Sequence, residues 1–130
     1  MRSSLACVRR PRVMPSMRSE KETAALEDML EHIDVALQWA QGSSVDSLYH
    51  DLMRLYAIIR CLEIISEASR RLSHELKGRH PSIRWRQMAD AGNVYRHKYE
   101  DVLPRRILKE LHDDLPPLRA VIEEELRVKQ

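Results

Sequence analysis

Apolar residues recur at helical spacing through most of the chain after its first twenty positions. The first stripe consists of Leu26, Leu30, Ile33, Leu37 and Ala40. Steps of three and four residues are typical of one face of an amphipathic helix. Ser19 is a good N-cap for this helix, and Gly42 followed by two serines is a stop signal. The pattern predicts a helix from Glu20 to about Gly42.

A longer apolar stripe follows a polar turn near Ser47. Its members are Leu48, Leu52, Leu55, Ile59, Leu62, Ile65, Ser69, Leu72 and Leu76. Gly78 and Pro81 close the stripe, so the spacing predicts one long helix between these limits. A second set of apolar positions lies on the opposite face of this segment. It consists of Met53, Ala57, Cys61 and Ile64. A helix that is apolar on two faces needs two partners, which favours homodimerisation through the second face.

Shorter patterns fill the last third of the chain. We expect a third helix from Trp85 toward His97, with Gly92 in its interior at a cost of about 1 kcal/mol relative to Ala. Pro104 is placed for the first turn of a fourth helix. The Leu-Pro-Pro run at 115–117 is a break that opens a fifth. Four or five antiparallel helices joined by short turns predict an all-α, up-and-down bundle.

Composition supports this fold and bounds the domain. Phe is absent and only three Gly occur, which argues against a sheet protein. No run approaches the roughly 18 apolar residues that a membrane span needs. Residues 1–19 are rich in Arg and lack apolar periodicity, so we expect a disordered basic extension before one helical domain at 20–130. Beyond residue 20 there are 19 acidic against 17 basic residues, which does not indicate a globally basic nucleic-acid binder.

Cysteine and histidine usage excludes several classes of site. Cys7 and Cys61 are too few for a disulfide scaffold or a multi-cysteine zinc site, and a reducing cytoplasmic location fits them. His74 and His80 have no further ligand at metal-binding spacing, so we expect no metal and no cofactor.

One polar cluster stands at the end of the third helix. It consists of Asp90, Asn93, Arg96, His97 and Tyr99. Asn93 lies one turn before His97 on the same helix face. A His near a helix C-terminus has its protonated form favoured by the helix dipole and can exchange protons around pH 7. From spacing alone, an ordinary helix-end His is the simpler interpretation.

Four sequence blocks bear a resemblance to a known family. They are IIRCLEIISEASRRLSHEL at 58–76, KGRHPSIRWRQMAD at 77–90, GNVYRHKYEDV at 92–102 and DDLPPLRAVIEEEL at 113–126. In this order they resemble the HepT-like toxins of the HEPN superfamily, from Leu26 to Leu126. The resemblance implies a homodimeric, all-α ribonuclease toxin that cleaves tRNA or mRNA. It also implies a minimal nucleotidyltransferase as antitoxin.

The family signature is Arg, a polar residue such as Asn, three variable residues, His, one variable residue and Tyr. The resemblance places Asn93, His97 and Tyr99 on this motif and puts Gly92 where the Arg stands. RNA cleavage through a 2′-hydroxyl needs a base, an acid and a cation for the developing phosphorane charge. His97 is suited to base or acid, and Asn93 to orienting His97 or the phosphate. Gly92 cannot supply the cation.

Several arginines could replace the missing cation. Arg96 is the nearest, although one residue along a helix corresponds to about 100° of rotation. Arg84 and Arg86 lie further back, and solvated surface charge is the simpler interpretation of all three. Glu67 and Arg60, on the predicted long helix, are candidate residues of a cleft near the His pair of a dimer. The alternative is that both are paired or exposed on the surface.

The resemblance gives Tyr99 a second role and leaves the activity open. In similar toxins the antitoxin transfers AMP from ATP to the motif Tyr, which blocks the site. Because Gly92 replaces the motif Arg, a catalytically inactive dimeric module is the alternative to an active ribonuclease. Such a module would bind the nucleotidyltransferase or a nucleotide without cleaving RNA.

Overall fold

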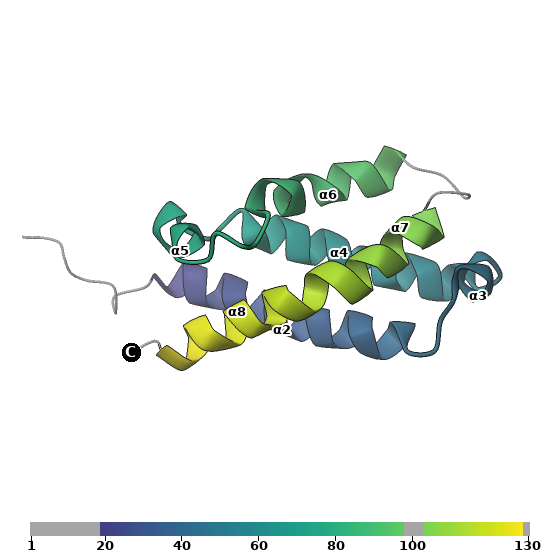
Figure 1. Cartoon of the computed structure of the whole chain (residues 1–130), viewed down its shortest axis with the longest axis horizontal. Helices are drawn as coiled ribbons and strands as arrows, with labels where there is room; N and C mark the ends of the chain where they lie inside the picture. The colour runs from purple at the N-terminus through teal and green to yellow at the C-terminus, as the bar shows by residue number, and fades with distance from the viewer. Residues whose placement is uncertain (1–18, 98–102, 129–130) are drawn as a thin grey trace, which may run out of the picture.

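The computed structural model describes residues 19–97 and 103–128, with 93–97 described as helical backbone (Figure 1). All of the described elements are helices. They are α2 (Glu20–Ala40), α3 (Val45–Tyr49), α4 (Leu52–Ser69), α5 (His74–Gly78), α6 (Trp85–His97), α7 (Leu103–Lys109), the π-helical turn η2 (Glu110–Asp114) and α8 (Leu115–Val128). The all-α prediction is confirmed. None of the described helices is long and apolar enough to cross a bilayer. The predicted extension at 1–19 lies outside the described residues except for Ser19.

The first helix begins and ends where its local signals predict. The Ser19 hydroxyl accepts a hydrogen bond of 3.0 Å from the backbone N–H of Glu22, which satisfies one of the free donors of the first turn. At the other end Gly42 has a φ of +78°, a left-handed conformation that glycine adopts without strain. These two residues define the ends of α2.

The predicted long second helix is wrong, because the segment forms three helices. Ser44 caps α3, Asp51 accepts a 3.1 Å bond from the N–H of Arg54 at the start of α4, and Ser73 caps α5. Each cap competes with helix continuation by offering the backbone a side-chain partner. Most of the apolar stripe still faces the core across these interruptions, because all three helices pack on one core, whereas Leu52 at the start of α4 is exposed. Leu48, Leu62 and Leu76, one in each helix, are buried.

The prediction that Leu115-Pro116-Pro117 opens a further helix is confirmed, because α8 begins at Leu115, but the expected break before it is absent. Helix continues from α7 through η2 into α8 without an intervening loop. Prolines in a helix interior lack the N–H that would bond to the carbonyl four residues earlier. The π-helical turn directly precedes Pro116 and Pro117 and changes the hydrogen-bond spacing at this point. The buried residues Leu111, Leu115 and Leu118 therefore form one continuous stripe across the prolines.

The helices pack around one apolar core (Figure 1). α4 runs antiparallel to α2 and packs on it, α8 packs along α2, and α6 lies on the other side of α4. The fully buried residues include Leu26, Ile33, Ile58, Ile107 and Ile122, drawn from helices across the whole domain. Burial of one such side chain stabilises the fold by roughly 1.5–3 kcal/mol.

The second apolar face predicted for residues 53–64 is only partly free. Cys61 is buried between helices, and burial raises the pKa of its thiol. Met53 is 84% exposed and Tyr56 is 59% exposed. α4 has neighbours on two sides, α2 and α6, so Cys61 belongs to the core. The free apolar surface is concentrated at the start of α4, where Leu52 is also exposed.

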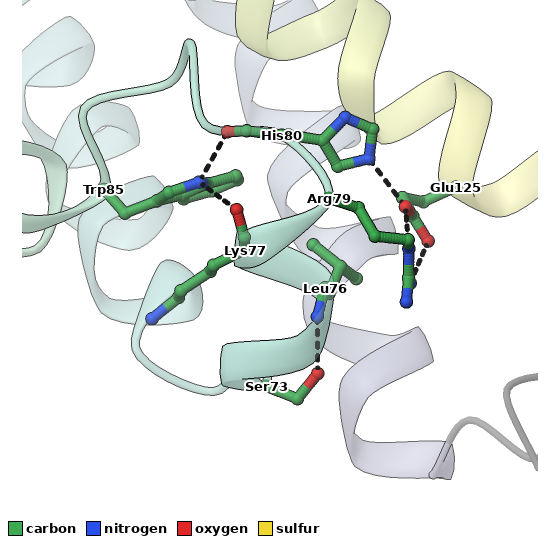
Figure 2. A network of polar contacts seen from close by, with 7 residues as sticks. All are labelled: Ser73, Leu76, Lys77, Arg79, His80, Trp85 and Glu125. Carbon is green, nitrogen blue, oxygen red and sulfur yellow. Dashed lines mark hydrogen bonds and ion pairs between the residues drawn. The ribbon is translucent and has the colours of Figure 1, made fainter. Parts of the chain in front are cut away.

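An ion cluster around the buried carboxylate of Glu125 joins the start of α6 to the end of the bundle (Figure 2). The carboxylate of Glu125 accepts hydrogen bonds of 2.9 and 3.1 Å from the Arg79 guanidinium and contacts Nε2 of His80 at 2.6 Å. The Trp85 indole N–H donates to the carbonyls of His80 at 3.0 Å and Lys77 at 3.2 Å. Burial raises the pKa of Glu125, but these hydrogen bonds and charges outweigh it and lower the pKa to about 2. The cluster fixes the position at which α6 begins.

We expect Glu125→Gln to lower the free energy of unfolding by about 3 kcal/mol at neutral pH. The pKa of Glu125 falls from 4.5 to about 2 on folding, so its ionisation stabilises the fold fully above pH 4.5. This stabilisation is lost as the pH falls from 4.5 toward 2. Urea unfolding at pH 7, 4 and 2.5 measures the effect, with the exposed neighbour Glu124→Gln as control. If Glu125→Gln were as stable as the control at pH 7, the prediction would be wrong.

Candidate functional site

One stripe of α6 faces solvent and contains two of the motif positions. Arg86 and Asp90 are exposed, whereas Met88, Ala91 and Gly92 are buried. At about 100° per residue, positions 86, 90, 93 and 97 fall within about 60° of one another. The backbone of α6 therefore puts the positions of Asn93 and His97 on its exposed side. The position of Arg96 is on the same side of α6 as positions 89 and 92, and this side packs against α4.

Ser66 and Arg70 of α4 hold α6 at a single carbonyl group. The Ser66 hydroxyl donates to the Ala89 carbonyl oxygen at 3.0 Å. The Arg70 guanidinium donates to the same oxygen from Nη2 at 2.6 Å and from Nε at 3.2 Å. A Cβ at position 92 would meet Ser66 Oγ at 3.7 Å, an ordinary van der Waals contact. Gly92 is therefore not required by close packing.

The exposed face of α4 and the exposed stripe of α6 lie on the same flank. Positions 60, 63, 67 and 70 of α4 fall within about 80° of one another, beginning about 40° from Ser66. α6 runs antiparallel to α4 (Figure 1). Because both helices are right-handed, the exposed face of α4 and the exposed stripe of α6 then point to the same side of the helix pair. We name this surface the motif flank. It consists of Arg60, Glu63, Glu67 and Arg70 of α4 and positions 86, 90, 93 and 97 of α6.

The structure thus places the two predicted cleft residues of α4 beside the motif positions. Arg60 is 71% exposed and lies 3.4 Å from Glu63. Glu67 is 70% exposed and lies 3.7 Å from Nη1 of Arg70. Exposed pairs of this kind contribute little to stability, so these residues are free to meet a ligand. Tyr99 lies outside the described residues.

A hollow lies on the opposite flank of α6. Its volume is about 680 Å³, and its walls are α6 and the α7–η2 segment. Met88 and Ala91 line its apolar part, and Arg84 crosses its rim to Asp114 at 3.4 Å. Arg84, one of the candidate cations, is therefore turned away from the motif flank, whereas Arg86 lies on it. Among the described residues, no three His, Cys, Asp or Glu side chains converge on a point that could hold a metal ion.

Arg70, like Glu63, is a residue of this surface that the sequence did not single out. Its contact with Ala89 depends on how α4 packs on α6, and nineteen residues separate the two in the chain. The available signal was its spacing of three and ten residues from Glu67 and Arg60, which places all three on one helix face.

Fold and flank together define a small all-helical domain with a polar His-containing stripe on an exposed helix. Comparison with known proteins identifies the class more closely. The family model described as "Ribonuclease HepT-like" matches residues 29–125, and the chain belongs to this family. The resemblance found in the sequence is thereby confirmed.

The chain is similar to several named relatives over most of their length. It is 34% identical over 98 residues to "Probable ribonuclease HepT" of Thermococcus cleftensis, covering 75% of this chain and 89% of that protein. It is 29% identical over 100 residues to "Putative RNase MJ1380" of Methanocaldococcus jannaschii, covering 77% and 92%. No solved structure matches at a significant level.

Proposed function

We propose that this protein is a metal-independent RNA endonuclease, the toxin of a toxin–antitoxin pair. The observation that carries the proposal is the exposed stripe of α6, which holds the positions of Asn93 and His97 in a domain of the ribonuclease HepT-like family. An exposed site suits a polymeric substrate such as tRNA or mRNA better than an enclosed pocket would.

The cleavage proceeds by attack of an RNA 2′-hydroxyl oxygen on the adjacent phosphorus. The bond between phosphorus and the 5′-oxygen breaks, which leaves a 2′,3′-cyclic phosphate and a 5′-hydroxyl. His97 removes the proton from the 2′-hydroxyl or protonates the leaving 5′-oxygen, and a second copy of His97 takes the other role. Asn93, one turn earlier, orients the phosphate or the imidazole.

We expect His97→Ala to lower the rate of tRNA cleavage in EDTA by about 10²–10⁴-fold, because the variant lacks the proton-transfer group. His112→Ala, an exposed histidine of η2, is the matched control and should cleave at the wild-type rate. The rate is followed with end-labelled tRNA on denaturing gels.

Silence of the wild-type protein at every concentration would overturn the endonuclease proposal. If the protein still bound a nucleotidyltransferase, the inactive binding module would take its place. Gly92 gives this second candidate its support, because no cation stands at that position.

We infer a homodimer from the apolar residues that adjoin the motif flank at the start of α4. The start of α4 exposes Met53 and Tyr56, and Arg60, Glu63 and Glu67 continue the same face. Apolar anchors beside charged residues are typical of a protein–protein interface. Pairing through this face brings two sets of motif positions toward each other, so each site receives two histidines.

We expect the double variant Met53→Glu/Tyr56→Glu to be monomeric, because pairing would bury two carboxylates without partners. It should also lose RNA cleavage, since each site would then hold a single His97. Light scattering coupled to gel filtration measures the mass. Ala24→Glu, at an exposed position of α2, is the control. A dimeric, active double variant would exclude this face as the interface.

The proposed antitoxin is a nucleotidyltransferase that modifies Tyr99. The phenolic oxygen of Tyr99 attacks the α-phosphorus of ATP, the bond to the β-phosphate oxygen breaks, and pyrophosphate leaves. The phenol proton passes to solvent or to a base of the transferase. The resulting phosphodiester adds bulk and negative charge two residues from His97, which repels an RNA phosphate.

We expect the nucleotidyltransferase and α-labelled ATP to label wild-type protein and the Tyr95→Phe control, but not Tyr99→Phe. The reason is that only the Tyr99 hydroxyl serves as acceptor. Intact-mass spectrometry should show one added AMP, and the modified protein should lose cleavage. Equal labelling of Tyr99→Phe would exclude this residue as the acceptor.

A further inference from the structure

We infer that Arg70 of α4 is the cation that binds the scissile RNA phosphate. The inference rests on the proposed endonuclease function and names a catalytic residue for it. The reaction places additional negative charge on the non-bridging phosphate oxygens, and a positioned guanidinium is the side chain best suited to bind them.

Arg70 contacts α6 one turn before the position of Asn93. Its guanidinium binds the Ala89 carbonyl oxygen through Nη2 at 2.6 Å and Nε at 3.2 Å. In an α-helix the N–H that bonds to the carbonyl of residue 89 belongs to residue 93. The guanidinium therefore stands against the turn that leads into Asn93, and it stands on the motif flank.

The two contacts with Ala89 hold the guanidinium and leave part of it available. Arginine carries five N–H groups, of which Ala89 takes two, and Glu67 faces Nη1 at 3.7 Å. The Arg70 side chain is 47% exposed, so the remaining N–H groups reach solvent. A guanidinium fixed in this way loses little conformational freedom when it binds a phosphate.

Arg84 and Arg60 are less well placed than Arg70. Arg84 pairs with Asp114 on the opposite flank. Arg60 pairs with Glu63, on α4 more than two turns from Arg70 and toward the start of the helix. Among the described arginines, Arg70 is the one that a hydrogen bond ties to α6.

The inference can be tested by removing the guanidinium at position 70 and introducing one at position 92. A Cβ there meets only Ser66 Oγ within 4 Å, at 3.7 Å, so Gly92→Arg introduces a second guanidinium beside the same turn without a backbone clash. Loss of helix packing in an Arg70 variant cannot be repaired from position 92, whereas loss of a phosphate-binding cation can.

The experiment compares cleavage of end-labelled tRNA in EDTA by wild type, Arg70→Ala, Gly92→Arg and the double variant. Arg71→Ala is the matched control, because Arg71 is the next residue and pairs with Asp28 on another face at 3.4 Å. We expect Arg70→Ala to lower kcat by about 10²–10³-fold. Arg71→Ala should stay within about twofold of wild type, and Gly92→Arg should restore at least tenfold of the loss in the Arg70→Ala background. Thermal unfolding of each variant monitors folding.

Three results would overturn the inference. The first is equal cleavage by Arg70→Ala and Arg71→Ala. The second is a folded double variant without recovery, which would assign Arg70 to helix packing alone. The third is a silent wild type with an active Gly92→Arg, which would show that Arg70 does not supply the cation. In the first two cases the endonuclease function stands. In the third, the wild-type protein is not an active endonuclease, and the activity belongs to the repaired site alone. Silence of every variant, Gly92→Arg included, would reject the proposed function itself.

Discussion

The packing of α6 on α4 is the contact on which the candidate site depends. α6 carries the motif positions and α4 carries the charged residues beside them, so neither helix forms the motif flank alone. Ser66 and Arg70 hold the Ala89 carbonyl, and the Trp85 indole is held one turn earlier. A shift of one residue would rotate α6 by about 100° and move positions 93 and 97 off the flank. The two anchors of α6, at Trp85 and at the Ala89 carbonyl, set its rotation about its own axis and its position along α4.

The buried carboxylate of Glu125 extends this constraint to the rest of the domain. A buried charge is costly unless it is fully paired, and Glu125 has both Arg79 and His80 as partners. The His80 carbonyl in turn accepts the Trp85 indole N–H. One acid of α8 therefore determines where the chain enters α6, although it lies far from the motif flank. The position of the site is thus coupled to the core by hydrogen bonds.

The elements that the sequence predicts well are those governed by local chemistry. The Ser19 cap, the Gly42 turn and the bounds of α6 follow from residue types and spacing, and the structure has all three. The two errors in the helix boundaries have a common cause. Apolar stripes continue across the caps at Asp51 and Ser73, and across the π-helical turn before the prolines, because packing on the core keeps the segments in phase. Periodicity reports the core-facing side of a segment and says little about small interruptions in its backbone.

The candidate site divides in the same way between local and tertiary information. The common stripe of Asn93 and His97 follows from four-residue spacing, and the chemistry proposed for these residues rests on the family resemblance. The partnership of Arg70 with α6 is different, since it requires the pairing of two helices and their relative level. The α7–η2 segment lies along one side of α6, and the motif flank lies on the opposite side, where the proposed second copy and RNA would bind. The missing side chain at Gly92 leaves space next to the Ser66 hydroxyl, which shares the Ala89 carbonyl with Arg70. With Arg70 as the proposed cation, the positive charge changes its position in the sequence while keeping its place against the same turn of α6.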